Sequence, residues 1–205
     1  MPRRLRYHVR PPIRMSDATL SAILDQPIFI GSTAASEPSV LRGHGISHVV
    51  AVSLELPSHL GQEFSCLHLP VADDIYAPIH HHLEPAASFI HSAIVGGGKV
   101  CVCCVVGASC SPTVVIYYLM RHALLSLAAA LDLVTASHPP TQPNIGFVQR
   151  LTEAEAWMSG CVTPTLSVEE YKWRFLQRLF PEADRTRILD ALQAGRHEVA
   201  QILQQ

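Results

Sequence analysis

Hydrophobic runs of strand length alternate with helical patterns over most of the chain. The runs that predict strands cover residues 27–31, 45–53, 64–70 and 100–104. Residues 83–95 carry apolar side chains at helical spacing and end at three consecutive glycines, a strong stop signal. A short helix over 36–42 is also predicted, with Ser36 as its N-cap and Gly43 as its stop. This alternation predicts an α/β fold, with a mostly parallel central sheet flanked by helices.

Composition fits a globular domain. Hydrophobic residues make up 48% of the 205 residues, and the net charge is −2, so we expect a substantial core and neither a nucleic-acid nor a membrane partner. The long apolar stretch over 113–133 is interrupted by Arg121 and His122. That interruption predicts two packed helices rather than a membrane span.

The two ends of the chain differ from its middle. Residues 1–19 are predicted to be a basic flexible tail, since 1–14 carry five arginines and no acid. Prolines oppose the amphipathic helix of a mitochondrial transit segment, so that targeting is the minority interpretation. Six cysteines without a secretory signal indicate a reducing compartment, and we expect a cytoplasmic or nuclear protein.

The candidate chemistry lies where the last predicted strand ends. Cys104 closes that strand, a loop of small residues follows, and an apolar helix begins near Pro112. Unpaired backbone N–H groups in such a loop and in the first helical turn converge on one point, where they attract an anion. The same field stabilises a thiolate, which is a strong nucleophile.

This stretch resembles the active-site loop of the cysteine-dependent dual-specificity protein phosphatases, which reads His-Cys, five residues, Arg, then Ser or Thr. The resemblance implies that Cys104 is the nucleophile and Ser111 the hydroxyl that follows the arginine. The phosphate loop would consist of Val105, Val106, Gly107, Ala108, Ser109 and Cys110. Two positions depart from the pattern, because Cys103 stands where the family has histidine and Cys110 where it has arginine.

The second departure determines the predicted function. Arginine grips two phosphate oxygens and carries a permanent charge, and losing such a clamp should cost about three to five decades in rate. The missing histidine should also leave less thiolate at neutral pH. We therefore predict a pseudophosphatase that binds a phosphoprotein or signalling partner without turnover. Cys101 and Cys103 are interpreted as small apolar fillers of the strand.

Two alternatives stay open. The first is a weakly active protein tyrosine/serine/threonine phosphatase that acts through Cys104, with Arg121 or another cation as compensation. Arg121 lies about 16 Å along the helix from Cys110, which weakens this interpretation. The second alternative is a redox-sensing protein in which Cys104 and Cys110 form a disulfide.

Other motifs extend the resemblance over residues 20–158. Asp73 follows a strand where the family has its general acid, with Asp74 as a possible substitute. Asn144 and Phe147 belong to a Pro-Asn-x-Gly-Phe motif that the family also has. The resemblance implies that Asn144 is the N-cap of a helix and that Phe147 packs beneath the loop. No cofactor or metal is expected, because the cysteine spacing is not that of a zinc site and the triple histidine at 80–82 has no partner ligands.

A linker over 159–166 and a helical extension over 167–205 complete the chain. Ser167 and Glu170 form a capping-box pattern that opens the first of three predicted helices. With the Leu179-Phe180-Pro181 corner, the extension loosely resembles ubiquitin-binding modules of the CUE or UBA type. Ubiquitin is therefore an alternative partner, and a plain helical extension is the favoured interpretation.

Overall fold

The computed structural model describes residues 20–60, 63–160 and 163–194. These residues fall into two units, which divide between Thr165 and Leu166. The predicted tail over 1–19, part of the linker and the predicted third C-terminal helix lie outside the described residues.

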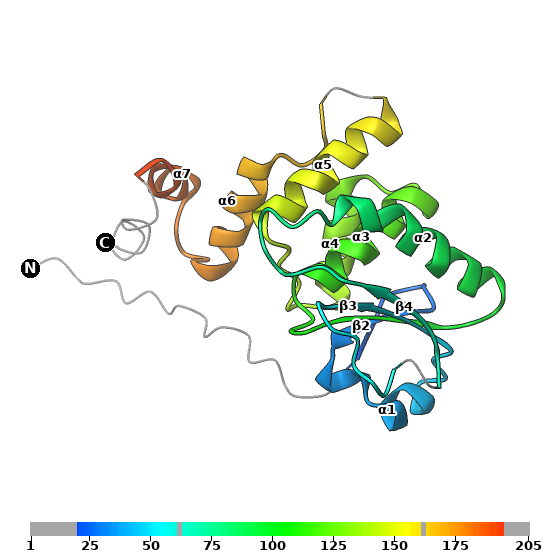
Figure 1. Cartoon of the computed structure of the whole chain (residues 1–205). Coiled ribbons are helices and arrows are strands. Elements are labelled where there is room, and N and C mark those ends of the chain that lie inside the picture. The colour runs from blue at the N-terminus through cyan, green and yellow to red at the C-terminus, as the bar shows by residue number, and fades with distance from the viewer. Residues whose placement is uncertain (1–19, 61–62, 161–162, 195–205) are drawn as a thin grey trace, which may run out of the picture. The chain divides into compact units, whose positions relative to one another are not determined.

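A five-stranded sheet forms the centre of the larger unit (Figure 1). Its strands are β1 (Ser21–Ala22), β2 (Ile28–Ser32), β3 (His48–Val52), β4 (Ser65–Leu69) and β5 (Val100–Cys104). Their order is β1-β2-β5-β3-β4, and only β1 runs antiparallel to its neighbour. The predicted α/β class with a mostly parallel sheet is confirmed. Because Cys104 pairs in register with Ser32 and Val52, it lies at the carboxyl edge of the central strands.

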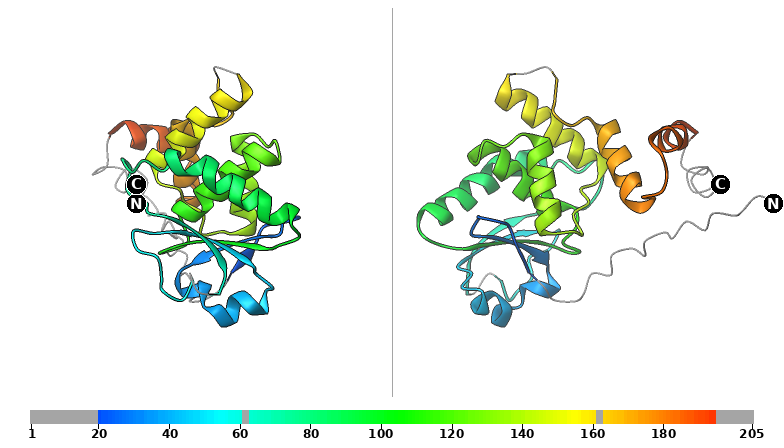
Figure 2. Two further views of the ribbon diagram at one scale, coloured as in Figure 1. Left: turned by 45° about the vertical axis from the view of Figure 1, so that its right-hand side comes forward. Right: turned by 180° about the vertical axis from the view of Figure 1, so that it is seen from behind.

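Helices cover both faces of this sheet, as Figure 2 shows. On one face lie α2 (His80–Val95), α3 (Cys110–His122), α4 (Leu127–Ser137) and α5 (Ile145–Ser159). The innermost is α3, which packs against the other three and is buried from Cys110 to Met120. The apolar stretch over 113–133 thus forms two packed helices, as predicted. No helix within the described ranges has the length and apolar character needed to cross a membrane.

The first helical segment differs from its prediction. A 3₁₀ turn, η1 (Ala34–Ser36), precedes α1 (Pro38–Gly43). The residue before α1 is Glu37, so Ser36 is not its N-cap. The buried Ser36 hydroxyl instead donates to the Ser32 carbonyl at 2.8 Å. Proline favours the first turn of a helix, where its missing N–H costs nothing, and Pro38 therefore moves the start of α1 past Ser36.

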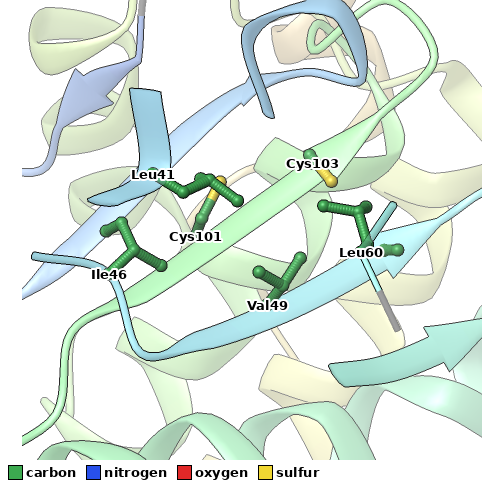
Figure 3. Close-up of a cluster of buried hydrophobic side chains, with 7 residues drawn as sticks. Leu41, Ile46, Val49, Leu60, Cys101 and Cys103 are labelled. Atoms are coloured by element: carbon green, nitrogen blue, oxygen red, sulfur yellow. The ribbon is translucent and has the colours of Figure 1, made fainter. Parts of the chain in front are cut away.

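A hydrophobic cluster fills the space between the sheet and α1 (Figure 3). Its buried members are Leu41, Ile46, Val49, Ala51, Leu60, Cys101 and Cys103. Side chains alternate along a strand, so Cys101 and Cys103 point into this cluster while Cys104 points to the opposite face. The interpretation of Cys101 and Cys103 as apolar fillers is confirmed.

The smaller unit contains α6 (Val168–Leu179) and α7 (Arg185–Ala194). The Ser167 hydroxyl accepts the Glu170 N–H at 3.0 Å and so caps α6, as predicted. Leu176, Phe180, Ala183 and Ile188 form a small buried core of their own. Two of the three predicted helices are therefore present, and they share this apolar core.

Candidate active site

The loop after Cys104 is held against the end of β2. Gly107 has φ of 82°, and a Cβ on it would lie 2.8 Å from the Gly31 carbonyl carbon, so only glycine fits. The Gly107 carbonyl accepts a hydrogen bond from His138 Nε2 at 2.8 Å. The next carbonyl, that of Ala108, accepts the Gln142 N–H at 2.7 Å. These contacts fix the backbone that surrounds the Cys104 sulfur.

His138 is a positioning residue that the sequence did not reveal. It is buried, and a carbonyl can only accept, so Nε2 carries the proton and Nδ1 accepts from the Ser21 hydroxyl at 2.8 Å. Burial lowers the pKa of His138, which favours this neutral form. In the sequence it stands before two prolines and is indistinguishable from a histidine in a surface loop.

Cys104 is poised as a thiolate. The Gly107 N–H donates to its sulfur at 3.2 Å, and the Ser111 hydroxyl lies 3.2 Å from the same atom. The Cys110 thiol, the Ser111 hydroxyl and backbone N–H groups lower the pKa of Cys104 to about 6 against the opposing effect of burial. We expected less thiolate because the family's histidine is missing, but the hydrogen bonds that remain make thiolate the main form at neutral pH.

Cys110 holds a neutral thiol beside Cys104. It is buried beside Cys104, and its hydrogen bond to Cys104, its burial and the nearby Asp73 carboxylate all raise the pKa of Cys110 far above its usual value. The proton of this pair thus stays on Cys110, and the Cys110 S–H group donates a hydrogen bond to the Cys104 sulfur. This part of the site therefore carries an uncharged side chain, at the position where the resemblance of the loop implied an arginine.

A pocket of about 500 Å³ opens over the two thiols. The polar or chemically reactive groups on its wall belong to Thr33, Ser53, Glu55, Asp73, Cys104 and Cys110, and the remaining lining is apolar. No lysine, arginine or histidine is among the described residues that line it. The described lining of the pocket therefore includes two thiols and two acidic residues, and no basic residue.

Asp73 is held beside the loop by two hydrogen bonds. Its Oδ1 accepts from the Ser109 hydroxyl at 2.7 Å and from the Asn144 amide at 2.8 Å. Asn144 also caps α5, because its Oδ1 accepts the Phe147 N–H at 3.0 Å, as the motif predicted. Phe147 is fully buried. The sequence implied a capping role for Asn144 but not this second role of orienting Asp73.

The segment after Asp73 is also fixed. The Asp74 carboxylate accepts a hydrogen bond from the Tyr76 N–H at 2.8 Å, which stabilises a turn. A Cβ on Gly146 would lie 1.9 Å from the Ile75 carbonyl oxygen, so the start of α5 packs directly on this loop. Asp73, rather than Asp74, is the carboxylate that lines the pocket.

Arg121 does not serve the loop. Its Nε lies 3.5 Å from the Glu84 carboxylate near the last turn of α3, and the Tyr117 hydroxyl donates to the same oxygen. No metal cluster of three or more His, Cys, Asp or Glu side chains occurs in the described part of the chain, and the triple histidine forms the first turn of α2.

The strand that ends at Cys104, the loop after it and the buried α3 form the part of the fold that holds the candidate site. The family description "Dual specificity phosphatase, catalytic domain" matches residues 28–156. The chain is 32% identical to mouse dual specificity protein phosphatase 14, over 73% of this chain and 77% of that protein. It belongs to the dual-specificity phosphatase family.

Solved structures agree with this assignment. The crystal structure of human DUSP28 matches with a TM-score of 0.65 and 32% identity, over 70% of this chain and 99% of that one. The human tyrosine phosphatase-like serine/threonine/tyrosine-interacting protein matches with a TM-score of 0.64 and 28% identity, over 68% of this chain and 97% of that one.

Proposed function

We propose that this chain is a catalytically impaired dual-specificity phosphatase that binds a partner protein through the pocket without turning it over. The observation that carries the proposal is the pocket lining, in which Cys110 stands where the family has arginine and no other cation replaces it among the described residues. A cytoplasmic location accords with its free cysteines.

The site retains part of the chemistry of phosphoryl transfer. The Cys104 thiolate could attack phosphorus while the bond to the leaving oxygen breaks, and Asp73 is placed to give that oxygen a proton. The equatorial phosphate oxygens, however, would meet only backbone N–H groups and a thiol. Since charge neutralisation supplies most of the rate in phosphoryl transfer, turnover should be negligible.

The proposed partner is a signalling protein or a phosphoprotein. A likeness to a solved protein whose name describes it as phosphatase-like and interacting supports a binding role. Binding of ubiquitin by the C-terminal helices stays a weaker proposal, which rests on the helical pattern of residues 167–205 alone.

Single-turnover hydrolysis of a phosphotyrosine peptide, with protein in excess, tests the proposal. We expect no product above that formed by the Cys104→Ser variant. Product that depends on Cys104 would favour the alternative function, a weakly active protein tyrosine/serine/threonine phosphatase.

A redox-sensing function is the second candidate, favoured by the contact between the Cys104 and Cys110 thiols. Peroxide would oxidise the Cys104 thiolate to a sulfenic acid, being itself reduced to hydroxide. The Cys110 thiol would then attack that sulfur, forming the disulfide and releasing water.

Mass spectrometry after mild peroxide treatment tests this step. The redox candidate predicts a bridged Cys104–Cys110 peptide in the native chain. In Cys110→Ser it predicts a Cys104 sulfenic acid that dimedone traps. Trapping of Cys104 without a bridge in the native chain would exclude Cys110 as its partner.

A further inference from the structure

The rim of the pocket is apolar and exposed. Val105 and Val106 in the loop are 66% and 51% exposed, and Leu54, which follows β3, is 67% exposed. All three line the pocket. The branched apolar side chains of this loop can pack against another apolar group, but they cannot donate hydrogen bonds to the oxygens of a phosphate.

The wall of the pocket is negatively charged. The acidic residues Glu55 and Asp73 line it, and neither has an ion-pair partner among the described residues. The Cys104 thiolate adds a third negative charge at the bottom. The Gly107 N–H and the Ser111 hydroxyl are already in contact with its sulfur, each at 3.2 Å.

These charges oppose a phosphate and favour a cation. A phosphate dianion would enter a space with three negative charges and no countercharge from the described residues, whereas a lysine or arginine side chain would meet carboxylates on the wall. A cation would also be held beside the thiolate. A volume of about 500 Å³ admits a long side chain, and the apolar rim can cover its aliphatic stem.

We propose that the pocket binds a lysine or arginine side chain of an unphosphorylated partner segment, flanked in that segment by apolar residues that rest on Leu54, Val105 and Val106. This inference rests on the proposed function, that the site binds and does not hydrolyse. It assigns the former phosphate pocket to a ligand of the opposite charge.

Two thiol reagents of similar size and opposite charge test the electrostatic field of the pocket in the full chain. The rates at which 2-(trimethylammonium)ethyl and 2-sulfonatoethyl methanethiosulfonate modify Cys104 are measured at pH 7 by peptide mapping. Each rate is divided by that of 2-mercaptoethanol with the same reagent. We expect the cationic reagent to be favoured at least tenfold and the preference to shrink with added salt.

Two variants show which charges cause the preference for the cationic reagent. Glu55→Gln should reduce the preference for the cationic reagent several-fold, and Cys110→Arg should reverse it. Glu63→Gln is the matched control, because Glu63 pairs with Arg42 and does not line the pocket, and it should leave the preference unchanged. Faster reaction with the anionic reagent in the native chain would overturn the proposal.

Protection of Cys104 from iodoacetamide tests the ligand itself. The probes are the amide-capped tripeptides acetyl-Leu-Arg-Leu, acetyl-Leu-citrulline-Leu and acetyl-Leu-phosphotyrosine-Leu. We expect protection by the arginine peptide alone, since citrulline keeps the shape of arginine and loses its charge. Equal protection by all three, none by any, or protection by the phosphopeptide would overturn the proposal.

The outcomes separate this inference from the proposed function. If the phosphopeptide protects Cys104 and is not hydrolysed, the proposed binding function stands, but the ligand carries a phosphate and this inference is overturned. Hydrolysis that depends on Cys104 would instead overturn the proposed function. Alkylation that slows as the protein alone is concentrated would identify a second copy as the occupant and contradict the partner assigned here.

Discussion

Replacing Cys110 with arginine is expected to create phosphatase activity in this chain. The Cys104 thiolate, Asp73 and the backbone of the loop are already in place, so the variant adds only the missing charge and donor fork. We expect single-turnover hydrolysis of a phosphotyrosine peptide to rise by about three decades or more. The measurement is product formed per protein under protein excess.

Matched variants show whether the charge is responsible. Cys110→Gln adds bulk and donors without a charge and should give much less product than Cys110→Arg. Cys104→Ser combined with Cys110→Arg should give none, because the nucleophile is gone. No gain from Cys110→Arg in a protein that unfolds normally would mean that the arginine cannot reach the phosphate, and the role assigned to position 110 would be wrong.

Replacing Gly107 with alanine is expected to give the largest loss of stability of the loop variants. The new Cβ would meet the Gly31 backbone at 2.8 Å, and the residue would keep a left-handed φ. Together these effects should lower the free energy of unfolding by about 2–4 kcal/mol. Denaturant unfolding of the variant and the native chain measures the difference.

Gly43→Ala is the control for this substitution. Gly43 ends α1, and a Cβ there would have no neighbour within 4 Å, so the change should be neutral or slightly stabilising. Rapid alkylation of Cys104 at pH 7 should also be lost in Gly107→Ala, because the clash would displace the loop and with it the backbone N–H of residue 107, which helps to lower the pKa of Cys104. A variant as stable as the native chain would contradict the close packing of the loop on β2.

The sequence predicted the strands of the parallel part of the sheet and the helices between them because each hydrophobic run is long and ends at a clear signal, whereas the two-residue strand β1 was missed. The glycines after residue 95 stop α2, and Asn144 caps α5. Cys104 could be placed at the sheet edge for the same reason, since it ends a buried strand. The start of α1 was predicted wrongly, because the preference of Pro38 for the first helical turn outweighs a serine two residues earlier.

The electrostatics of the site could not be predicted in the same way. Glu55 reaches the pocket from the loop after β3, about fifty residues before Cys104, and no local pattern connects the two. The two hydrogen bonds to Asp73 likewise join segments that are distant in the chain. The pKa of Cys104 depends on such contacts, which explains why the missing histidine alone suggested less thiolate than the site holds.

We propose that the reactive cysteine in this pocket cannot transfer phosphate because no cation from the described residues lines it. Single-turnover hydrolysis of a phosphotyrosine peptide by the native chain tests it most directly, with the protein in large excess and Cys104→Ser in parallel. The account predicts the same negligible product from both proteins, alongside clear product from Cys110→Arg. Product from the native chain that disappears in Cys104→Ser would contradict the claim and make this protein a working phosphatase.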